Sequence, residues 1–378
     1  MNIVVFLTHN LSLLDWKRIG ILNRELSLYQ KLTEKNCKFK IITYGNLKDK
    51  RIKLYKNIEI FPIYKELKRN NNFFFKFFYP IYFICKNRVI FKDCNLIKTN
   101  QIIGGHLAVI AKILFRKKLI IRLGYEPYIL VKSYSKNLVL KYLYKLNSIF
   151  CFIFADYIIV TSNQIREKII KYYSVSKKKI GVNPNFVDTD KFTIINNGNK
   201  NKYFNTIFTI SRLDEQKNLE FLFNQVKESS IQLHIYGSLK GIKKYKDLIN
   251  EIGCDVRFKG PIDNEKLPMI INNYLIFILL SHSEGNPKAL LEAMSCGRIA
   301  IGRNVEGINN IIKDQSNGFI LDNNKNNLKN IIFKIKTKNK KKLLSIQKKA
   351  RKFILQNFCL KKIVLRELKI YKKVENKN

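Results

Sequence analysis

Two carboxylates, Glu284 and Glu292, lie in the segment 281–297, SHSEGNPKALLEAMSCG, which follows an apolar run. Glu284 precedes a predicted helix, and Glu292 would stand about 7–8 Å along the helix axis at 1.5 Å per residue. That distance is comparable with the reach from a diphosphate to a ribose. Glu292 could therefore bind vicinal hydroxyls of a nucleotide, and Glu284 the hydroxyls of a sugar beyond the phosphates. The alternative is an acidic first turn that complements the helix dipole, together with an ordinary exposed acid.

The residues around these acids predict where the helix begins and ends. Asn286 suits the N-cap, Pro287 suits the first helical position, and Gly297 suits the left-handed C-terminal cap. The amino end of such a helix carries unpaired N–H groups and the positive end of the helix dipole. This combination is typical of a phosphate-binding site.

Two basic residues, Arg212 and Lys217, lie in a second segment, 209–218 (TISRLDEQKN), which follows another predicted strand. We expect both side chains to leave the carboxyl end of that strand. Fixed cations beside the amino end of a helix can stabilise the charge that grows on a departing diphosphate.

The elements that must position these residues alternate between short apolar strands and amphipathic helices, which indicates βαβ units and parallel sheets. The predicted strands are 3–8, 39–44, 58–63, 96–99, 119–123, 157–161, 206–210, 232–236, 256–259, 275–280 and 299–301. The predicted helices include 17–32, 73–89, 106–115, 163–173, 219–228, 243–252, 265–272, 287–295, 308–313, 360–374 and a lysine-rich stretch over 325–351. The pattern predicts an α/β protein with two doubly wound, Rossmann-like domains that face a central cleft, where such folds bind ligands.

The domain boundary is predicted at the polar segment 196–203, NNGNKNKY. We expect one domain over 1–195, a second over 196–358, and a C-terminal helix over 359–378 that packs back on the first domain.

The composition excludes several classes of protein. With 378 residues, of which 46% are hydrophobic, the chain can build real cores and is not disordered. Its seven cysteines form no CxxC pair, which argues against a disulfide framework or a zinc ribbon and fits a reducing cytoplasm. No run approaches the ~20 apolar residues that cross a bilayer. We expect no secretory signal, because the first residues have no basic stretch and only a short apolar run.

The formal net charge of +43 is unusual. It favours an anionic partner, such as nucleic acid, an anionic membrane or an anionic substrate. A compositional bias toward Lys, Asn, Ile, Phe and Tyr, as AT-rich coding produces, is the competing explanation.

Four segments together resemble a known family, the retaining GT-B glycosyltransferases of family 4 (group 1). SEGNPKALLEAMSCG resembles its E-x7-E motif, and ISRLDEQKN resembles its GRL…K segment. NPNFVDTDKF and DQSNGFIL resemble its NGVD…F linker and its GxxG strand, in the expected order over 183–321. The first half resembles the family mainly in its layout, and LDWKRIGILNRELSLYQKL resembles a variant of the glycine-rich first loop and helix.

The resemblance implies roles for the residues that match. Arg212 and Lys217 correspond to the residues that hold the donor diphosphate, Glu292 to the acid that binds the ribose, and Glu284 to the acid near the transferred sugar. The loop residues Gly285, Asn286, Pro287 and Lys288 would meet the sugar and phosphates, and Gly20 lies near the glycine of the first loop.

Some positions depart from the family pattern. Ser211 and Phe186 stand where glycines are usual, and the Gly-Gly pair of the first loop is missing between His9 and Gly20. This absence leaves the contacts of the first loop open.

The acceptor side has weaker candidates. His106 follows two glycines at a helix start, in a region where relatives place a residue that faces the acceptor, and we include it among the candidate catalytic residues. Asn100, Gln101 and the segment 122–126 follow predicted strands and are further candidates. An ordinary helix-start histidine is the alternative for His106.

No metal or cofactor is expected. Asp188 and Asp190 spell a DxD motif, but they lie in the linker match and not after a strand that begins a nucleotide pocket. Since basic side chains are present for the diphosphate, we predict metal-independent catalysis. The resemblance implies retention without a covalent enzyme intermediate.

The predicted function is transfer of a sugar from a nucleoside-diphosphate sugar, with a UDP-sugar as first choice, to a glycan or lipid-linked acceptor in cell-envelope polysaccharide or lipopolysaccharide synthesis. The acceptor would bind the domain over 1–195 and the donor the domain over 196–358. The aromatic segment 73–92 and the charge suggest a cytoplasmic enzyme that is peripheral on an anionic membrane. The alternative for residues 73–89 is one helix, or a pair of helices, packed in a core. A nucleotide-sugar epimerase of the same fold and a basic nucleic-acid-binding protein remain alternatives, although nucleic acid is not the partner that we expect.

Overall fold

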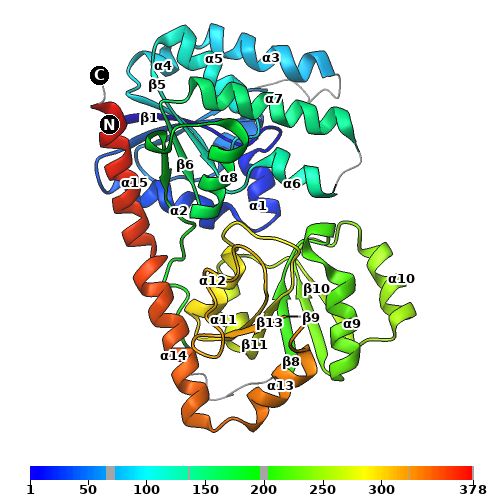
Figure 1. Cartoon of the computed structure of the whole chain (residues 1–378). Helices are drawn as coiled ribbons and strands as arrows, with labels where there is room; N and C mark the ends of the chain where they lie inside the picture. Colours follow the sequence, from blue (N-terminus) through cyan, green and yellow to red (C-terminus); the bar gives the residue numbers. More distant parts are fainter. Residues whose placement is uncertain (65–72, 135–136, 196–202, 323, 377–378) are drawn as a thin grey trace. The chain divides into compact units, whose positions relative to one another are not determined.

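The computed structural model describes residues 1–64, 73–134, 137–195, 203–322 and 324–376 (Figure 1). By its internal contacts the chain divides into two units, Met1–Pro184 with Val364–Asn378, and Asn185–Ile363. The segment 196–202, which covers most of the predicted boundary, lies outside the described residues. The predicted domain limits at 195/196 and 358/359 stay predictions.

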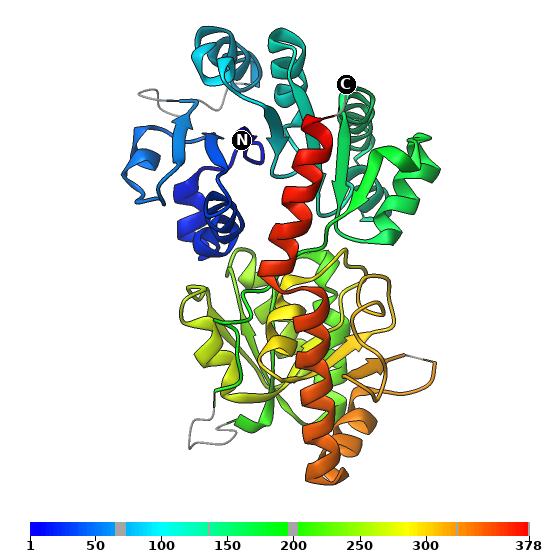
Figure 2. The same cartoon turned by 90° about the vertical axis from the view of Figure 1, so that its left-hand side faces the viewer.

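The first unit contains a seven-stranded sheet in the order β3-β2-β1-β4-β5-β6-β7, in which every neighbouring pair is parallel. Figures 1 and 2 show this unit from two directions. The strands are β1 (Asn2–Phe6), β2 (Lys38–Thr43), β3 (Ile58–Pro62), β4 (Leu96–Thr99), β5 (Lys118–Leu123), β6 (Tyr157–Val160) and β7 (Ile180–Val182). Six of them were predicted from the sequence. The seventh, β7, has three residues, too few to show a pattern.

Helices cover both faces of this sheet because the strand residues are apolar on both sides. The core on one face joins strand residues to the helices α3 (Phe73–Lys86), α4 (Val89–Lys92), α5 (Gly105–Phe115), α7 (Leu138–Phe154) and α8 (Asn163–Tyr173). The remaining helical segments are α1 (Leu13–Arg18), α2 (Leu22–Thr33), α6 (Pro127–Tyr134), η1 (Leu47–Arg51) and η2 (Lys177–Lys179).

The helix predicted over 17–32 is wrong as a single element. Two helices replace it, α1 and α2, and Gly20 lies between them with a φ of 72°. Glycine adopts this left-handed conformation without the steric cost that other residues meet. The glycine therefore ends one helix and turns the chain into the next.

The C-terminal helix α15 (Leu360–Glu375) is joined to the first sheet by a buried ion pair. Glu367 on α15 binds Lys98 on β4 at 2.7 Å, and neither side chain is exposed to solvent. Burial acts to raise the pKa of Glu367, but the charges of Lys98 and Arg122 outweigh it, so that its pKa is lowered. Asn183 donates a second hydrogen bond to Glu367 at 2.5 Å. The ionised carboxylate therefore fastens α15 to the sheet.

The second unit contains a six-stranded parallel sheet in the order β10-β9-β8-β11-β12-β13. Its strands are β8 (Tyr203–Ile210), β9 (Gln232–Tyr236), β10 (Val256–Gly260), β11 (Tyr274–Leu279), β12 (Ile299–Arg303) and β13 (Phe319–Leu321). Its helices are η3 (Glu215–Lys217), α9 (Leu219–Ser229), α10 (Ile242–Ile252), α11 (Leu267–Asn272), α12 (Lys288–Ser295), α13 (Leu328–Thr337) and α14 (Lys340–Asn357). Two doubly wound parallel sheets confirm the predicted fold class.

The helix predicted over 308–313 is wrong. The segment forms turns, in which the N–H groups of Ile308 and Ile311 bond three residues back while those of Asn309 and Ile312 bond four residues back. The isoleucines are buried, so their spacing reflects packing against the sheet and not an α-helical ladder.

Among the described residues, no helix is both long and apolar enough to cross a membrane.

Candidate active site

The second sheet reverses its strand order between β8 and β11. β8 lies between β9 and β11, so the connections from β8 and from β11 run to opposite sides. In open parallel sheets, ligands bind outside the carboxyl ends of the strands at such a point. The segment with Arg212 and Lys217 follows β8, and the segment with Glu284 follows β11. The topology therefore brings the two predicted segments to one position.

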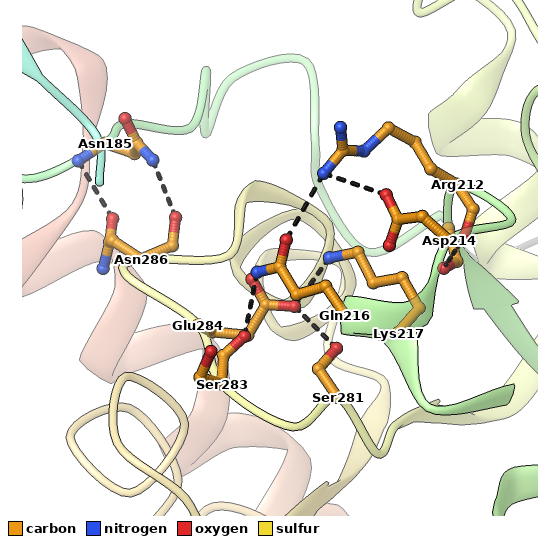
Figure 3. Close-up of polar contacts among 10 residues, drawn as sticks. Asn185, Arg212, Asp214, Gln216, Lys217, Ser281, Ser283, Glu284 and Asn286 are labelled. Atoms are coloured by element: carbon orange, nitrogen blue, oxygen red, sulfur yellow. Dashed lines mark hydrogen bonds and ion pairs between the residues drawn. The ribbon is translucent and has the colours of Figure 1, made fainter. Parts of the chain in front are cut away.

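Lys217 and Glu284 form an ion pair across this point (Figure 3). Lys217 Nζ lies 2.6 Å from Glu284 Oε1, and their side chains are only 14% and 8% exposed. Ser281 Oγ donates to the same carboxylate oxygen at 2.7 Å. One oxygen of Glu284 is thus held by a cation and a hydroxyl in a largely dry setting, where each interaction is stronger than in water.

Gln216 connects the two segments through its side chain and its backbone. Its Nε2 donates to the carbonyl of Ser283 at 3.0 Å, and its own carbonyl accepts from the N–H of His282 at 2.9 Å. These bonds fix the loop that carries Glu284 against the loop that carries Lys217 (Figure 3). Sequence reasoning quoted Gln216 and Ser281 within its segments but assigned neither of them a role.

Arg212 is placed differently from Lys217. Its side chain is 69% exposed, and its Nη2 lies 3.2 Å from Asp214 Oδ2 and 3.5 Å from Gln216 Oε1. Exposed pairs of this kind contribute little to stability. The guanidinium is therefore available to an anion at low cost, whereas Lys217 must exchange its carboxylate partner.

The helix α12 begins one residue later than predicted. Pro287 is the N-cap residue, in an extended conformation, and Lys288 is the first helical residue. The prediction that Asn286 is the N-cap residue is therefore wrong. Its side chain is used elsewhere: Asn286 Oδ1 accepts from the backbone N–H of Asn185 at 2.9 Å, and Asn185 Nδ2 donates to the Asn286 carbonyl at 2.7 Å (Figure 3).

The consequence for α12 is an amino end that no N-cap side chain satisfies. The N–H groups of a first helical turn have no partner within the helix, so that they favour an anionic ligand. Gly297 has a φ of 68° directly after the C-cap, as predicted. Glu292 lies inside α12 and is buried.

Gly307 is a residue of this site that sequence reasoning missed. It has a φ of 80°, and a Cβ at this position would lie 2.1 Å from the carbonyl oxygen of Glu284 and 3.0 Å from that of Gly285. Any other residue would have to displace the loop of Glu284. Nothing in the spacing of the sequence indicates this close approach.

The first unit has a corresponding switch point between β1 and β4. His9 follows β1, and His106 is the second residue of α5, with 6.1 Å between the ring centres. His106 Nδ1 lies 3.4 Å from Asn147 Oδ1, and burial lowers the pKa of His106. A lowered pKa favours the neutral imidazole, which can both accept and donate a hydrogen bond.

Other candidates of the first unit have partners in the fold. Asn100 Oδ1 accepts from Tyr29 OH at 3.1 Å, and Gln101 Oε1 accepts from the N–H of Gly124 at 2.9 Å. Glu126 accepts from Ser148 Oγ and from the N–H of Ile129, both at 2.6 Å. These contacts give the three polar residues structural roles.

The amino end of α1 is occupied by carboxylates of the protein itself. Asp49 accepts from the N–H groups of Leu13 and Leu14 at 3.2 and 3.1 Å, and Ser12 and Asp15 form a capping box. A phosphate would have to displace Asp49, which is fully buried. Gly20, at the other end of α1, serves the turn into α2, and its predicted contact with the donor stays a prediction.

The aspartates of the DxD sequence have local roles. Asp188 Oδ1 accepts from the N–H groups of Asp190 and Lys191, and Asp190 pairs with Lys361 at 2.8 Å. In the part of the chain that the structure describes, no group of three or more His, Cys, Asp or Glu residues is arranged to hold a metal ion. Metal independence itself stays a prediction.

Comparison with known families gives the class of enzyme. The family model described as "Glycosyltransferase Family 4" matches residues 23–191, and the model described as "Glycosyl transferases group 1" matches residues 190–353. The chain belongs to this family of retaining GT-B glycosyltransferases, which use nucleotide-sugar donors. The epimerase and nucleic-acid-binding alternatives are thereby set aside.

Individual relatives agree with this assignment. The chain is 27% identical over 357 residues to an uncharacterized glycosyltransferase of Methanocaldococcus jannaschii, covering 89% of this chain and 86% of that protein. It is 31% identical over 206 residues to the UDP-Gal:alpha-D-GlcNAc-diphosphoundecaprenol alpha-1,3-galactosyltransferase of Escherichia coli, covering 50% of this chain and 53% of that enzyme. Sucrose-phosphate synthase from Thermosynechococcus elongatus shares the fold, with a TM-score of 0.83 at 17% identity over 99% of both chains.

Proposed function

We propose that this glycosyltransferase transfers a sugar from a UDP-sugar, with retention of anomeric configuration, to a glycan or lipid-linked acceptor in cell-envelope polysaccharide synthesis. The observation that carries the proposal is the Lys217–Glu284 ion pair at the strand switch point of the second unit. The cation can bind a negatively charged diphosphate, and the carboxylate beside it can accept a hydrogen bond from a sugar hydroxyl.

Most of the residues that would bind the donor belong to the second unit, and Gly20 of the first unit stays a further candidate. Arg212 and Lys217 would hold the diphosphate, and the amino end of α12 would receive a phosphate oxygen. Glu292 would accept hydrogen bonds from the ribose hydroxyls. The segment from Gly285 to Lys288 would contact the sugar and the phosphates. Gly307, which has no side chain, leaves room for the backbone of this loop.

The ion pair also suggests how donor binding prepares the site. A diphosphate that takes Lys217 as a partner releases Glu284 Oε1 from its cation. The carboxylate, still held by Ser281, would then accept hydrogen bonds from the hydroxyls of the transferred sugar. Binding would therefore exchange one buried ion pair for two ligand contacts.

In the reaction, the bond between the sugar C1 and the phosphate oxygen breaks, and its electron pair goes to the diphosphate. Arg212 and Lys217 would stabilise this growing negative charge. The acceptor hydroxyl forms the new bond on the same face of the sugar, and its proton passes to an oxygen of the leaving phosphate. No covalent enzyme intermediate is required.

The acceptor would bind to the first unit. Its switch point presents His9 and His106, and a neutral His106 could orient an acceptor hydroxyl. The Escherichia coli relative is named for a lipid-linked acceptor, GlcNAc-diphosphoundecaprenol, and for a UDP-sugar donor. This supports a lipid-linked acceptor and a peripheral position on the inner face of the cytoplasmic membrane.

A donor screen tests the proposal. Thermal denaturation of the purified protein with UDP-, GDP- and ADP-sugars should show stabilisation by UDP-sugars, and proton NMR of the product should show retained anomeric configuration. Arg212→Ala, in an exposed residue, should remove the stabilisation without unfolding the protein. Equal response to all three nucleotides, or an inverted product, would contradict the proposal.

A further inference from the structure

We propose that one face of the first unit, formed by α3, α4, α5 and α7, docks on an anionic lipid surface. We call it the outer helix face and define it by exposed apolar residues of these helices, chiefly Val89, Leu114, Leu138, Val139, Leu143 and Leu146. The inference deepens the proposed function, because it assigns the surface by which the enzyme would reach a lipid-linked acceptor.

The four helices form one continuous layer. α5 packs against α3, α4 and α7, and all four contribute to the core on the same face of the first sheet. Figure 1 shows α3, α5 and α7 running side by side along one side of this unit. Their outward sides therefore share one surface.

The outward side of α7 is more apolar than a solvated helix needs to be. α7 buries Ser148, Cys151 and Phe152 against the unit, yet Leu138 and Val139 are 75% and 70% exposed. A helix at the surface of a globular protein has one apolar stripe, which faces the core. A second apolar stripe on the opposite side indicates a surface that contacts something else.

The positive charge of these helices favours a negatively charged binding partner. α3, α4, α5 and α7 contain no aspartate or glutamate. From residue 73 to residue 154 the chain has fourteen Lys and Arg residues, of which Lys98 and Arg122 are buried on strands, and two acids, Asp93 and Glu126. Asp156, just beyond this range, pairs with Lys112 of α5. Glu126 is buried and bonded to Ser148, which leaves Asp93 as the exposed acid.

This pattern argues against a second copy as the occupant. Two copies that met through the outer helix face would bring together two surfaces on which basic side chains outnumber acidic ones. Apolar side chains interspersed with lysines instead fit the interface of a membrane with anionic headgroups, where the apolar groups enter the acyl boundary.

A pocket in this layer offers a place for one headgroup. It has a volume of about 430 Å³ and is lined by Cys85, Arg88, Val89, Lys92, Leu114 and Phe115. Arg88 and Lys92 can bind a phosphate oxygen, and the other four residues can contact the adjoining acyl chain. The sequence suggested a membrane contact over 73–92 only; α5 and α7 extend it.

Vesicle co-sedimentation of the full chain tests the proposal. The probes are phosphatidylcholine vesicles with and without phosphatidylglycerol. We expect binding only to the anionic vesicles. Val139→Ser/Leu143→Ser on α7 should weaken this binding at least ~10-fold. Arg88→Gln/Lys92→Gln on α4 should weaken it about 25-fold, at about fivefold for each lost cation near the surface.

The second unit supplies matched controls. Phe333→Ser on α13 removes an equally exposed apolar residue, and Lys348→Gln/Lys349→Gln on α14 removes two exposed cations. Both should bind within about twofold of wild type, since each change lies outside the outer helix face. Equal losses in control and test variants would overturn the proposal, because binding would then not depend on the outer helix face.

Two further measurements keep this inference separate from the proposed reaction. Calorimetry with UDP should give the wild-type affinity in both outer-face variants. If UDP fails to bind the wild-type protein while vesicles do, the proposed function fails and the docking face stands. A wild-type dimer that the outer-face substitutions dissociate, without vesicle binding, would assign the face to a second copy and overturn the inference.

Discussion

The Lys217–Glu284 pair leads to a prediction in which two substitutions have opposite effects on donor binding. We proposed that the diphosphate competes with Glu284 for Lys217, whose Nζ lies 2.6 Å from the carboxylate. Glu284→Gln keeps the size of the side chain and its contact with Ser281, but removes the competing charge. It should therefore tighten the binding of free UDP while lowering kcat about 100-fold, because the sugar loses its carboxylate.

Lys217→Ala should do the reverse. It removes a charge-assisted hydrogen bond worth about 1.5–3 kcal/mol. It also leaves Glu284, only 8% exposed, beside the position of the diphosphate. Two like charges about 4 Å apart repel by about 4 kcal/mol at an effective dielectric constant of 20, and we take about half of this for a site open to water. The sum, about 4 kcal/mol, corresponds to a roughly 1,000-fold weaker Kd.

The double variant Lys217→Ala/Glu284→Gln separates the two contributions. Removing the uncompensated charge should recover about 2 kcal/mol, a roughly 30-fold gain in UDP affinity over Lys217→Ala. Isothermal titration calorimetry with UDP measures all four proteins, and thermal denaturation checks their folding. Arg212→Ala serves as the control, because its exposed cation has no buried carboxylate to leave behind and Glu284→Gln should not rescue it. If Glu284→Gln weakens UDP binding, or fails to rescue Lys217→Ala, the exchange of partners is refuted.

Three other predictions concern single sites. Glu292→Gln should weaken UDP binding about 10- to 100-fold with a smaller change in kcat, measured by calorimetry and steady-state kinetics; an unchanged Kd would exclude a contact with the ribose. Glu367→Gln should lower the free energy of unfolding by about 3–5 kcal/mol, since it leaves Lys98 charged and buried, whereas Lys98→Met/Glu367→Leu should cost much less in urea denaturation; equal losses would contradict the pairing. Burial, with Lys259 and Arg257 nearby, lowers the pKa of His234 to about 4. The unfolded chain then binds the proton first, so the free energy of unfolding should fall by about 2 kcal/mol as pH drops from about 6.5 to about 4, and His234→Gln should flatten this slope.

The sequence predicts the sheets of this protein well because each strand is a short, nearly continuous apolar run between turn residues. β4, β9 and α8 have the predicted limits, and most other elements differ by a few residues. The errors occur where a distant contact overrides a local pattern. Asparagine is a preferred N-cap residue, but the side-chain oxygen of Asn286 accepts a hydrogen bond from the backbone N–H of Asn185 instead.

The site itself could be predicted only to the level of its segments. The order of strands places Arg212, Lys217 and Glu284 at one edge of a sheet, and their residue types suggest a diphosphate and a sugar. Which cation meets the carboxylate depends on the positions of two loops that are 67 residues apart in sequence. The roles of Gln216 and Gly307 likewise arise from close approach between loops, which periodicity does not encode.

The central claim is that the diphosphate of the donor binds between Arg212, Lys217 and the amino end of α12. A crystal structure of the UDP complex tests it most directly. We predict phosphate oxygens within hydrogen-bonding distance of Lys217 Nζ and of the first-turn N–H groups of α12, with Glu284 released from Lys217. UDP bound elsewhere, or a diphosphate beside an intact Lys217–Glu284 pair, would contradict the claim.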